Sequence, residues 1–112
     1  EIAQEILSSL GYDVSTVENG HLAVEYVREN EVDLLILDMI MEEGFDGLDT
    51  YREIIKFKGD QKAIIISGYA ETGRVKEAQK LGAGKYLRKP YTIEKIAETV
   101  REEVDRVQPN IS

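Results

Sequence analysis

The chain has 112 residues, of which 42% are apolar and 32% charged, which suits one small globular domain with a buried core and excludes a disordered chain. With 22 acidic and 14 basic residues, the formal net charge is −8, and such an acidic surface argues against broad nucleic-acid binding. The absence of cysteine excludes disulfides, thiolate metal sites and cysteine catalysis, and the apolar runs are too short to span a membrane.

The first half of the chain predicts helix, strand, helix and strand in turn. A helix is predicted over residues 2–10, where isoleucine and leucine recur at helical spacing, and Gly11 is placed to end it. Residues 12–17 predict a short strand, and residues 21–30 predict a helix after an Asn-Gly turn. The continuous apolar run 34–37 predicts a strand buried on both faces.

The second half of the chain repeats the alternation. Helices are predicted over 48–57, 71–81 and 92–107, each with apolar residues on one side. Between them, residues 63–67 predict a second fully buried strand and residues 85–88 predict a short final strand.

Strict alternation of helices and strands predicts an α/β fold with a flavodoxin-like, doubly wound parallel sheet and helices on both faces. Four strands are predicted in all, within a single domain covering residues 1–112. A doubly wound sheet normally begins with a strand, whereas this chain begins inside a helical pattern. We therefore expect that the domain is truncated at its N-terminus and that its first strand is missing from the sequence.

Three polar residues follow the predicted strands, at the edge where open parallel sheets bind their ligands. Asp38 ends one strand, Ser67 ends the next, and Lys89 follows the last. Taken singly, these residues also fit a turn, a helix cap and a solvated lysine. Together they suggest phosphoryl chemistry, because a carboxylate can attack phosphorus while an ammonium and a hydroxyl hold the phosphoryl oxygens.

The motifs around these residues resemble the receiver domain of two-component response regulators. The resemblance covers essentially all of the 112 residues, and its motifs are specific only in combination. They are Asn19-Gly20, the run from Asp33 to Met41, Asp46-Gly47-Leu48, Ile64 to Gly68, Leu81-Gly82-Ala83 and Tyr86 to Tyr91.

The resemblance implies a role for each matching residue. Asp38 is the expected phosphoacceptor, which takes a phosphoryl group from a sensor histidine kinase or a histidine phosphotransfer protein. Ser67 is the expected switch hydroxyl, Lys89 the lysine that pairs with phosphate, and Tyr86 the switch aromatic. A divalent metal, Mg²⁺, is expected on Asp38 and the backbone carbonyl of Ile40. The Lys89–Pro90 bond is one that is cis in the family.

The resemblance also implies partners and a location. A downstream protein is expected to bind the face formed by the last two helices and the last strand. Basic residues gather along this part of the sequence, and they form either a docking surface or an ordinary solvated face. They are Arg74, Lys76, Lys80, Lys85 and Arg88. The expected location is the cytoplasm, with the domain either standing alone or belonging to a hybrid sensor histidine kinase tethered to a membrane.

The chain departs from the family pattern in two places. The acidic pair that the family places at the end of its first strand, as the main metal ligands, is absent. Either the domain is a trimmed piece of a complete receiver, or it lacks the metal site. The loop after the acceptor is longer and carries Met41-Glu42 where the family commonly has Met-Pro. Ile40 and Tyr69 hold the positions that set phosphoryl lifetime in the family, and neither offers a carboxylate or amide to orient an attacking water, so slow self-dephosphorylation is expected.

Two other kinds of function compete with the phosphoacceptor. A pseudo-receiver would share the fold and act as a protein-binding module without phosphorylation, and the missing acidic pair is its support. A flavodoxin-like enzyme would need a phosphate-binding loop rich in serine, threonine or glycine after a strand, and the sequence has none. His21 is expected to be an exposed residue near a helix start, with no role as ligand or phosphodonor.

Overall fold

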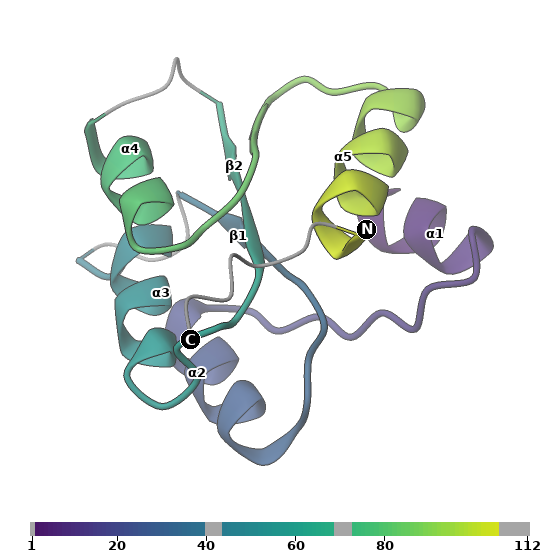
Figure 1. Cartoon of the computed structure of the whole chain (residues 1–112). Coiled ribbons are helices and arrows are strands. Elements are labelled where there is room, and N and C mark those ends of the chain that lie inside the picture. Colours follow the sequence, from purple (N-terminus) through teal and green to yellow (C-terminus); the bar gives the residue numbers. More distant parts are fainter. Residues whose placement is uncertain (1, 40–43, 69–72, 106–112) are drawn as a thin grey trace.

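The computed structural model describes residues 2–39, 44–68 and 73–105. In these ranges a parallel sheet of three strands, in the order β1-β2-β3, lies between two layers of helices (Figure 1). The predicted α/β doubly wound architecture is therefore confirmed. The strands are β1 (Leu35–Asp38), β2 (Ala63–Ser67) and β3 (Tyr86–Arg88).

Helices cover both faces of the sheet in two layers (Figure 1). The first layer consists of α2 (Gly20–Glu29), α3 (Gly47–Ile55) and α4 (Gly73–Lys80). The second layer consists of α1 (Ile2–Ser9) and α5 (Ile93–Asp105), which pack against each other. No helix in the described ranges combines the length and the apolar character needed to cross a bilayer.

Alternation along the strands divides the core between the two faces. Leu37 and Ile65 pack with the layer of α2, α3 and α4, whereas Ile64 and Ile66 pack with α1 and α5. Every residue of β2 is buried, because this central strand has helices over both faces and a strand on each side. Burial of this apolar surface is the main force that holds the sheet and helices together.

Capping residues set several helix boundaries. The side chain of Asn19 accepts a hydrogen bond from the amide of Leu22 and begins α2. Asp46 begins α3 in a capping box with Asp49, in which each side chain accepts a hydrogen bond from the other residue's amide. Gly11 has a φ of 96°, which is the left-handed conformation expected of the glycine after α1.

The predicted strand over residues 12–17 does not form, so three strands are described where four were predicted. The sequence pattern itself is visible, because Tyr12 and Val14 pack on the second core while Asp13 and Ser15 are exposed. A strand, however, requires hydrogen bonds to a neighbour, and no described segment pairs with residues 12–17. Alternation of half-buried and exposed residues was thus insufficient to predict that residues 12–17 pair with another strand.

Two apolar residues predicted to lie on buried helix faces are exposed instead. Leu10 is 52% exposed because α1 ends at Ser9, and Ile93 is 59% exposed at the first position of α5. The predicted helix ends at residues 71–72 and 106–107 lie outside the described residues, as does the loop carrying Met41-Glu42.

Candidate functional site

The candidate site lies at the carboxyl ends of the three strands. Asp38 ends β1, Ser67 ends β2, and Lys89 directly follows β3. The amide of Met39 donates to the carbonyl of Ile66 at 2.8 Å, and the amide of Lys89 donates to the carbonyl of Ser67 at 2.8 Å. These bonds extend the parallel ladder beyond the strand ends, so the three residues predicted from the sequence lie at one edge of the sheet.

Asp38 and Lys89 form a direct ion pair between carboxylate and ammonium. Their side chains are 32% and 45% exposed, so a partner can reach the pair from solvent. A hydrogen bond between two charged groups is stronger than one between neutral groups. The pair therefore places a cation beside the carboxylate at the end of β1. The peptide bond Lys89–Pro90 is cis, as the resemblance implied.

Ser67 is buried, with 3% of its surface exposed, at the last position of β2. The alternative interpretation as a helix cap is not supported, because Gly68, which directly follows Ser67, is not helical. Arg88 lies opposite Ser67 in the register of β2 and β3, which places Ser67 one residue from Lys89 on the neighbouring strand. The hydroxyl thus belongs to the strand edge and not to the start of α4.

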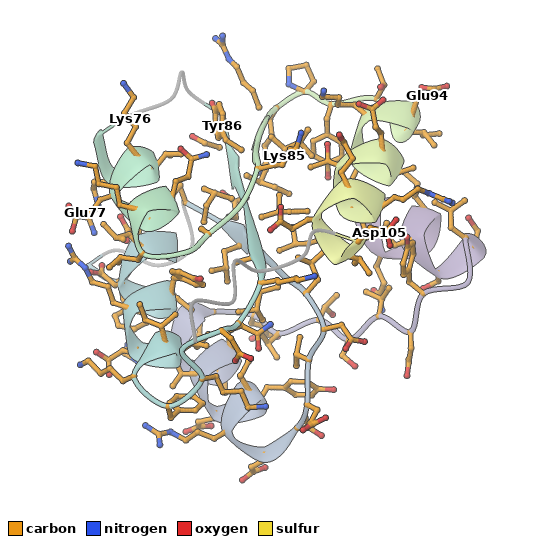
Figure 2. The ribbon with its side chains drawn as sticks, viewed as in Figure 1. Lys76, Glu77, Lys85, Tyr86, Glu94 and Asp105 are labelled. Atoms are coloured by element: carbon orange, nitrogen blue, oxygen red, sulfur yellow. The ribbon has the colours of Figure 1, made fainter. Side chains whose placement is uncertain are left out.

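Tyr86 is half-buried on β3 and packs against the core shared by α2, α3 and α4. Figure 2 labels it on the side of the sheet that α4 covers. It lies opposite Ile65, so two strand positions separate it from the ladder position of Ser67. An aromatic ring at this place is both a core residue and a neighbour of the strand edge.

The start of α3 packs closely behind Asp38. A Cβ atom added to Gly47 would lie 3.0 Å from the backbone carbonyl oxygen of Asp38, so only glycine allows this approach without a shift. This contact gives a physical reason for the Asp46-Gly47 pair that the sequence analysis singled out by resemblance. It fixes the first turn of α3 against the end of β1.

An ion pair that the sequence analysis did not predict ties α3 to α4. Arg74 binds both carboxylate oxygens of Asp46, at 2.6 and 3.0 Å, and one oxygen of Asp49 at 3.3 Å. Burial alone would raise the pKa of Asp46. The hydrogen bonds from Arg74 and from the Asp49 backbone, together with the Arg74 charge, outweigh this effect and hold the pKa below its usual value. The hydrogen bond with Asp46 in turn raises the pKa of Arg74.

The expected metal site is only partly represented. No group of three or more histidine, cysteine, aspartate or glutamate side chains that could hold a metal occurs in the described part of the chain. Asp38 supplies one carboxylate, whereas Mg²⁺ prefers six oxygen ligands, often with several of them water. Ile40, whose carbonyl was expected to contribute, lies outside the described residues, as does Tyr69. The described residues alone therefore do not make a complete magnesium site.

The basic residues near the last strand do not form an unbroken stripe. Arg74 pairs with Asp46, and Lys85 pairs with Glu102 of α5 at 3.3 Å. Figure 2 labels Lys76 and Glu77 on α4, and Glu77 pairs with Arg52 of α3. This interleaving of opposite charges makes the surface mixed, as on an ordinary solvated face.

His21 is exposed at the start of α2, as expected. Its ring stacks on Phe45, with 4.0 Å between the ring centroids, so the start of α2 contacts the segment that leads into α3. No sequence pattern predicts this contact, because His21 and Phe45 belong to different parts of the chain.

A family model described as the response regulator receiver domain matches residues 1–101. The transcriptional regulatory protein ZraR of Klebsiella oxytoca is 38% identical over 101 residues, which is 90% of this chain but only 23% of that regulator. The chemotaxis protein CheY of Thermotoga maritima is 32% identical over 98 residues, covering 87% of this chain and 81% of that protein. Sporulation initiation phosphotransferase F of Bacillus subtilis is 28% identical over 100 residues, 89% of this chain and 80% of that protein.

Solved structures share the fold. A CheY-like receiver domain protein from Methanospirillum hungatei has a TM-score of 0.85 at 21% identity, covering 93% of this chain and 82% of that one. The receiver domain of the sensor histidine kinase PA1611 from Pseudomonas aeruginosa has a TM-score of 0.82 at 23% identity, covering 94% and 87%. The latter is described with a magnesium ion coordinated in its active site cleft.

Proposed function

The chain belongs to the response regulator receiver domain family, and from that membership we propose that Asp38 accepts a phosphoryl group from a phosphohistidine. The donor would be a sensor histidine kinase or a histidine phosphotransfer protein. The ion pair between Asp38 and Lys89 at the carboxyl end of the sheet carries this proposal. It combines an accessible nucleophile with a cation that can hold a phosphoryl oxygen.

The transfer step follows from the groups at the strand ends. A carboxylate oxygen of Asp38 attacks phosphorus, so that a P–O bond forms while the P–N bond to the donor imidazole breaks. The electron pair of the broken bond leaves with the imidazole, which takes up a proton. The Asp38 carboxylate loses its own charge on forming the acyl phosphate, and the transferred phosphoryl group brings negative charge with which the ammonium of Lys89 can pair.

Phosphorylation would act as a switch through Ser67 and Tyr86. In this proposal the hydroxyl of Ser67 donates to a phosphoryl oxygen, and Tyr86 rotates as the chain around β2 adjusts. A two-state equilibrium shifts by the difference in interaction energy between its states, so these contacts would favour one arrangement of α4, β3 and α5. That face would bind the downstream partner. The cysteine-free chain suits the cytoplasm, either alone or as part of a membrane-tethered hybrid kinase.

In this proposal, Asp38 would be one ligand of a bound Mg²⁺ ion. A bound divalent cation would neutralise charge on the transferring phosphoryl group. Asp38 is the described residue that could be one of its ligands, and the acidic pair expected from the family is absent from the sequence. A second candidate is a pseudo-receiver that binds proteins without being phosphorylated, and the lack of a group of three metal-binding side chains in the described part of the chain favours it.

Intact mass before and after incubation with acetyl phosphate, with and without Mg²⁺, distinguishes the two candidates. Gain of one phosphoryl group, lost in Asp38→Asn, is expected of the phosphoacceptor. Asp33→Asn is the matched control, because Asp33 lies near the opposite end of the same strand and should leave the gain intact. A full-length wild-type protein that gains no mass with Mg²⁺ present would instead indicate the pseudo-receiver.

A further inference from the structure

The ion pair of Arg74 with Asp46 joins the first turns of α3 and α4, which lie side by side in Figure 1. Both nitrogens of the guanidinium fork that face Asp46 are used, at 2.6 and 3.0 Å, and the same fork reaches Asp49 at 3.3 Å. Most surface ion pairs contribute little, but two-pronged arginine–carboxylate geometry is the arrangement in which a surface pair does contribute.

The place of this pair in the chain connects it to the candidate site. The segment of the chain that follows Asp38 ends at Asp46 and Gly47, where α3 begins. Gly47 packs against the backbone carbonyl of Asp38. Arg74 lies in the first turn of α4, which follows the segment that leaves Ser67. The pair therefore joins the far ends of the two segments that begin at the expected phosphoacceptor and at the expected switch hydroxyl.

We propose that Asp46, Asp49 and Arg74 form a latch that holds α4 against α3 in the unphosphorylated protein and so opposes the switch. The inference rests on the proposed function of Asp38. In the same structure Lys89 pairs with the Asp38 carboxylate, and phosphorylation would convert that carboxylate to an acyl phosphate. A contact present in only one of two states stabilises that state and weakens any ligand that favours the other. Arg74 is thus a positioning residue, acting through Asp46.

The chain contains a matched control for the latch. Arg52 of α3 and Glu77 of α4 form a second ion pair between the same two helices. Arg52 and Glu77 each lie three residues after a latch residue, Asp49 and Arg74, so this pair is about one helical turn further from the segments that follow Asp38 and Ser67. Its side chains are 42% and 47% exposed, against 48% for Arg74. Loss of either pair should loosen the packing of α3 against α4, whereas only loss of the latch should affect phosphorylation.

The test is a titration of the full-length protein with beryllofluoride, a phosphoryl analogue, in the presence of Mg²⁺. The NMR signals of Ser67 and Tyr86 report binding and give the concentration of beryllofluoride that half-saturates the protein. Arg74→Gln and Asp46→Asn should each lower this concentration about two- to fivefold, because the resting state loses its latch. Asn still caps α3, so Asp46→Asn removes the charge and keeps the helix start. The double variant should match the single ones, Arg74→Lys should fall between, and Arg52→Gln should equal wild type.

Three results would overturn the latch. The first is an unchanged or higher half-saturating concentration in Arg74→Gln when wild type binds the analogue. The second is an equal effect of Arg52→Gln, which would show general loosening of α3 and α4. The third is additive effects of Asp46→Asn and Arg74→Gln, since two members of one pair must be coupled. Failure of wild type itself to bind would instead remove the proposed function, and the latch with it.

Discussion

The two ends of the parallel sheet are both rich in charged side chains but use them differently. At the amino end, a cavity of ≈ 350 Å³ is lined by Asp33, Lys58 and Lys62 among others. Polar groups there bind backbone: Gln61 donates to the Val32 carbonyl at 2.9 Å, and Lys62 donates to the Val104 carbonyl at 2.7 Å. At the carboxyl end, Asp38 and Lys89 bind each other through side chains that solvent can reach.

This comparison separates a hollow at the amino end, whose polar groups bind backbone, from an exposed charged pair at the carboxyl end. At the amino end, these hydrogen bonds join the segment before β2 to the segment before β1 and to the end of α5. They therefore stabilise the fold. At the carboxyl end, Asp38 and Lys89 form an exposed charged pair, and a reactant that binds one of them can take the place of the other. Substitutions at the two ends should therefore separate stability from phosphorylation.

The largest expected effect is on the activity of the carboxyl end. Lys89→Ala should slow phosphorylation of Asp38 by acetyl phosphate about ten- to a hundredfold, because a charge-assisted contact to the phosphoryl group is lost. The rate is followed by intact mass over time. Lys62→Ala, which removes a lysine from the other end of the sheet, should leave the rate within about twofold. Equal rates for Lys89→Ala and wild type would contradict the role of Lys89.

The next effect concerns the stability of the amino end. The buried hydroxyl of Tyr51 donates to the Gln61 carbonyl at 2.8 Å, so Tyr51→Phe leaves a buried acceptor with one partner fewer. The free energy of unfolding should fall by about 1–2 kcal/mol, measured by urea denaturation. Phosphorylation at a temperature where the variant is folded should be unchanged. A wild-type midpoint in urea would show that this bond contributes nothing.

A smaller loss of stability is expected when the end of α5 loses its cation. Lys62→Ala removes the ammonium that binds the Val104 carbonyl, where a positive charge also interacts favourably with the helix dipole. The expected destabilisation is about 0.5–1 kcal/mol. Lys62→Arg should restore part of it, and if Lys62→Ala destabilises more than Tyr51→Phe, the ranking of the contacts at this end is wrong.

The smallest effect is a dependence of stability on pH at the carboxyl end. The folded pKa of Asp46 is lowered, so its contribution is fully present above the unfolded pKa and is lost as pH falls through the folded value. Between about pH 5 and pH 2, wild type should lose more stability than Asp46→Asn, by less than about 1 kcal/mol. Urea denaturation across this range measures the difference, and parallel curves would contradict it.

The sequence was sufficient for the site because parallel strands place their carboxyl ends at one edge. Asp38, Ser67 and Lys89 could therefore be grouped before any coordinates were known. Pairing of residues 12–17 could not be predicted, since a strand depends on a neighbour and not only on its own alternation. The contact of Arg74 with Asp46 could not be predicted either, because the two residues are 28 positions apart in the sequence. The sequence shows that both are charged but not that they form a pair.

The central claim is that the phosphoryl group arrives at the carboxyl end of β1, on Asp38. Borohydride reduction converts a phosphorylated aspartate to homoserine, and peptide mass spectrometry then locates that residue. After treatment with acetyl phosphate and Mg²⁺, homoserine should be found at position 38 and nowhere else. Homoserine at Asp33, Asp46 or Asp49, with Asp38 intact, would contradict the account.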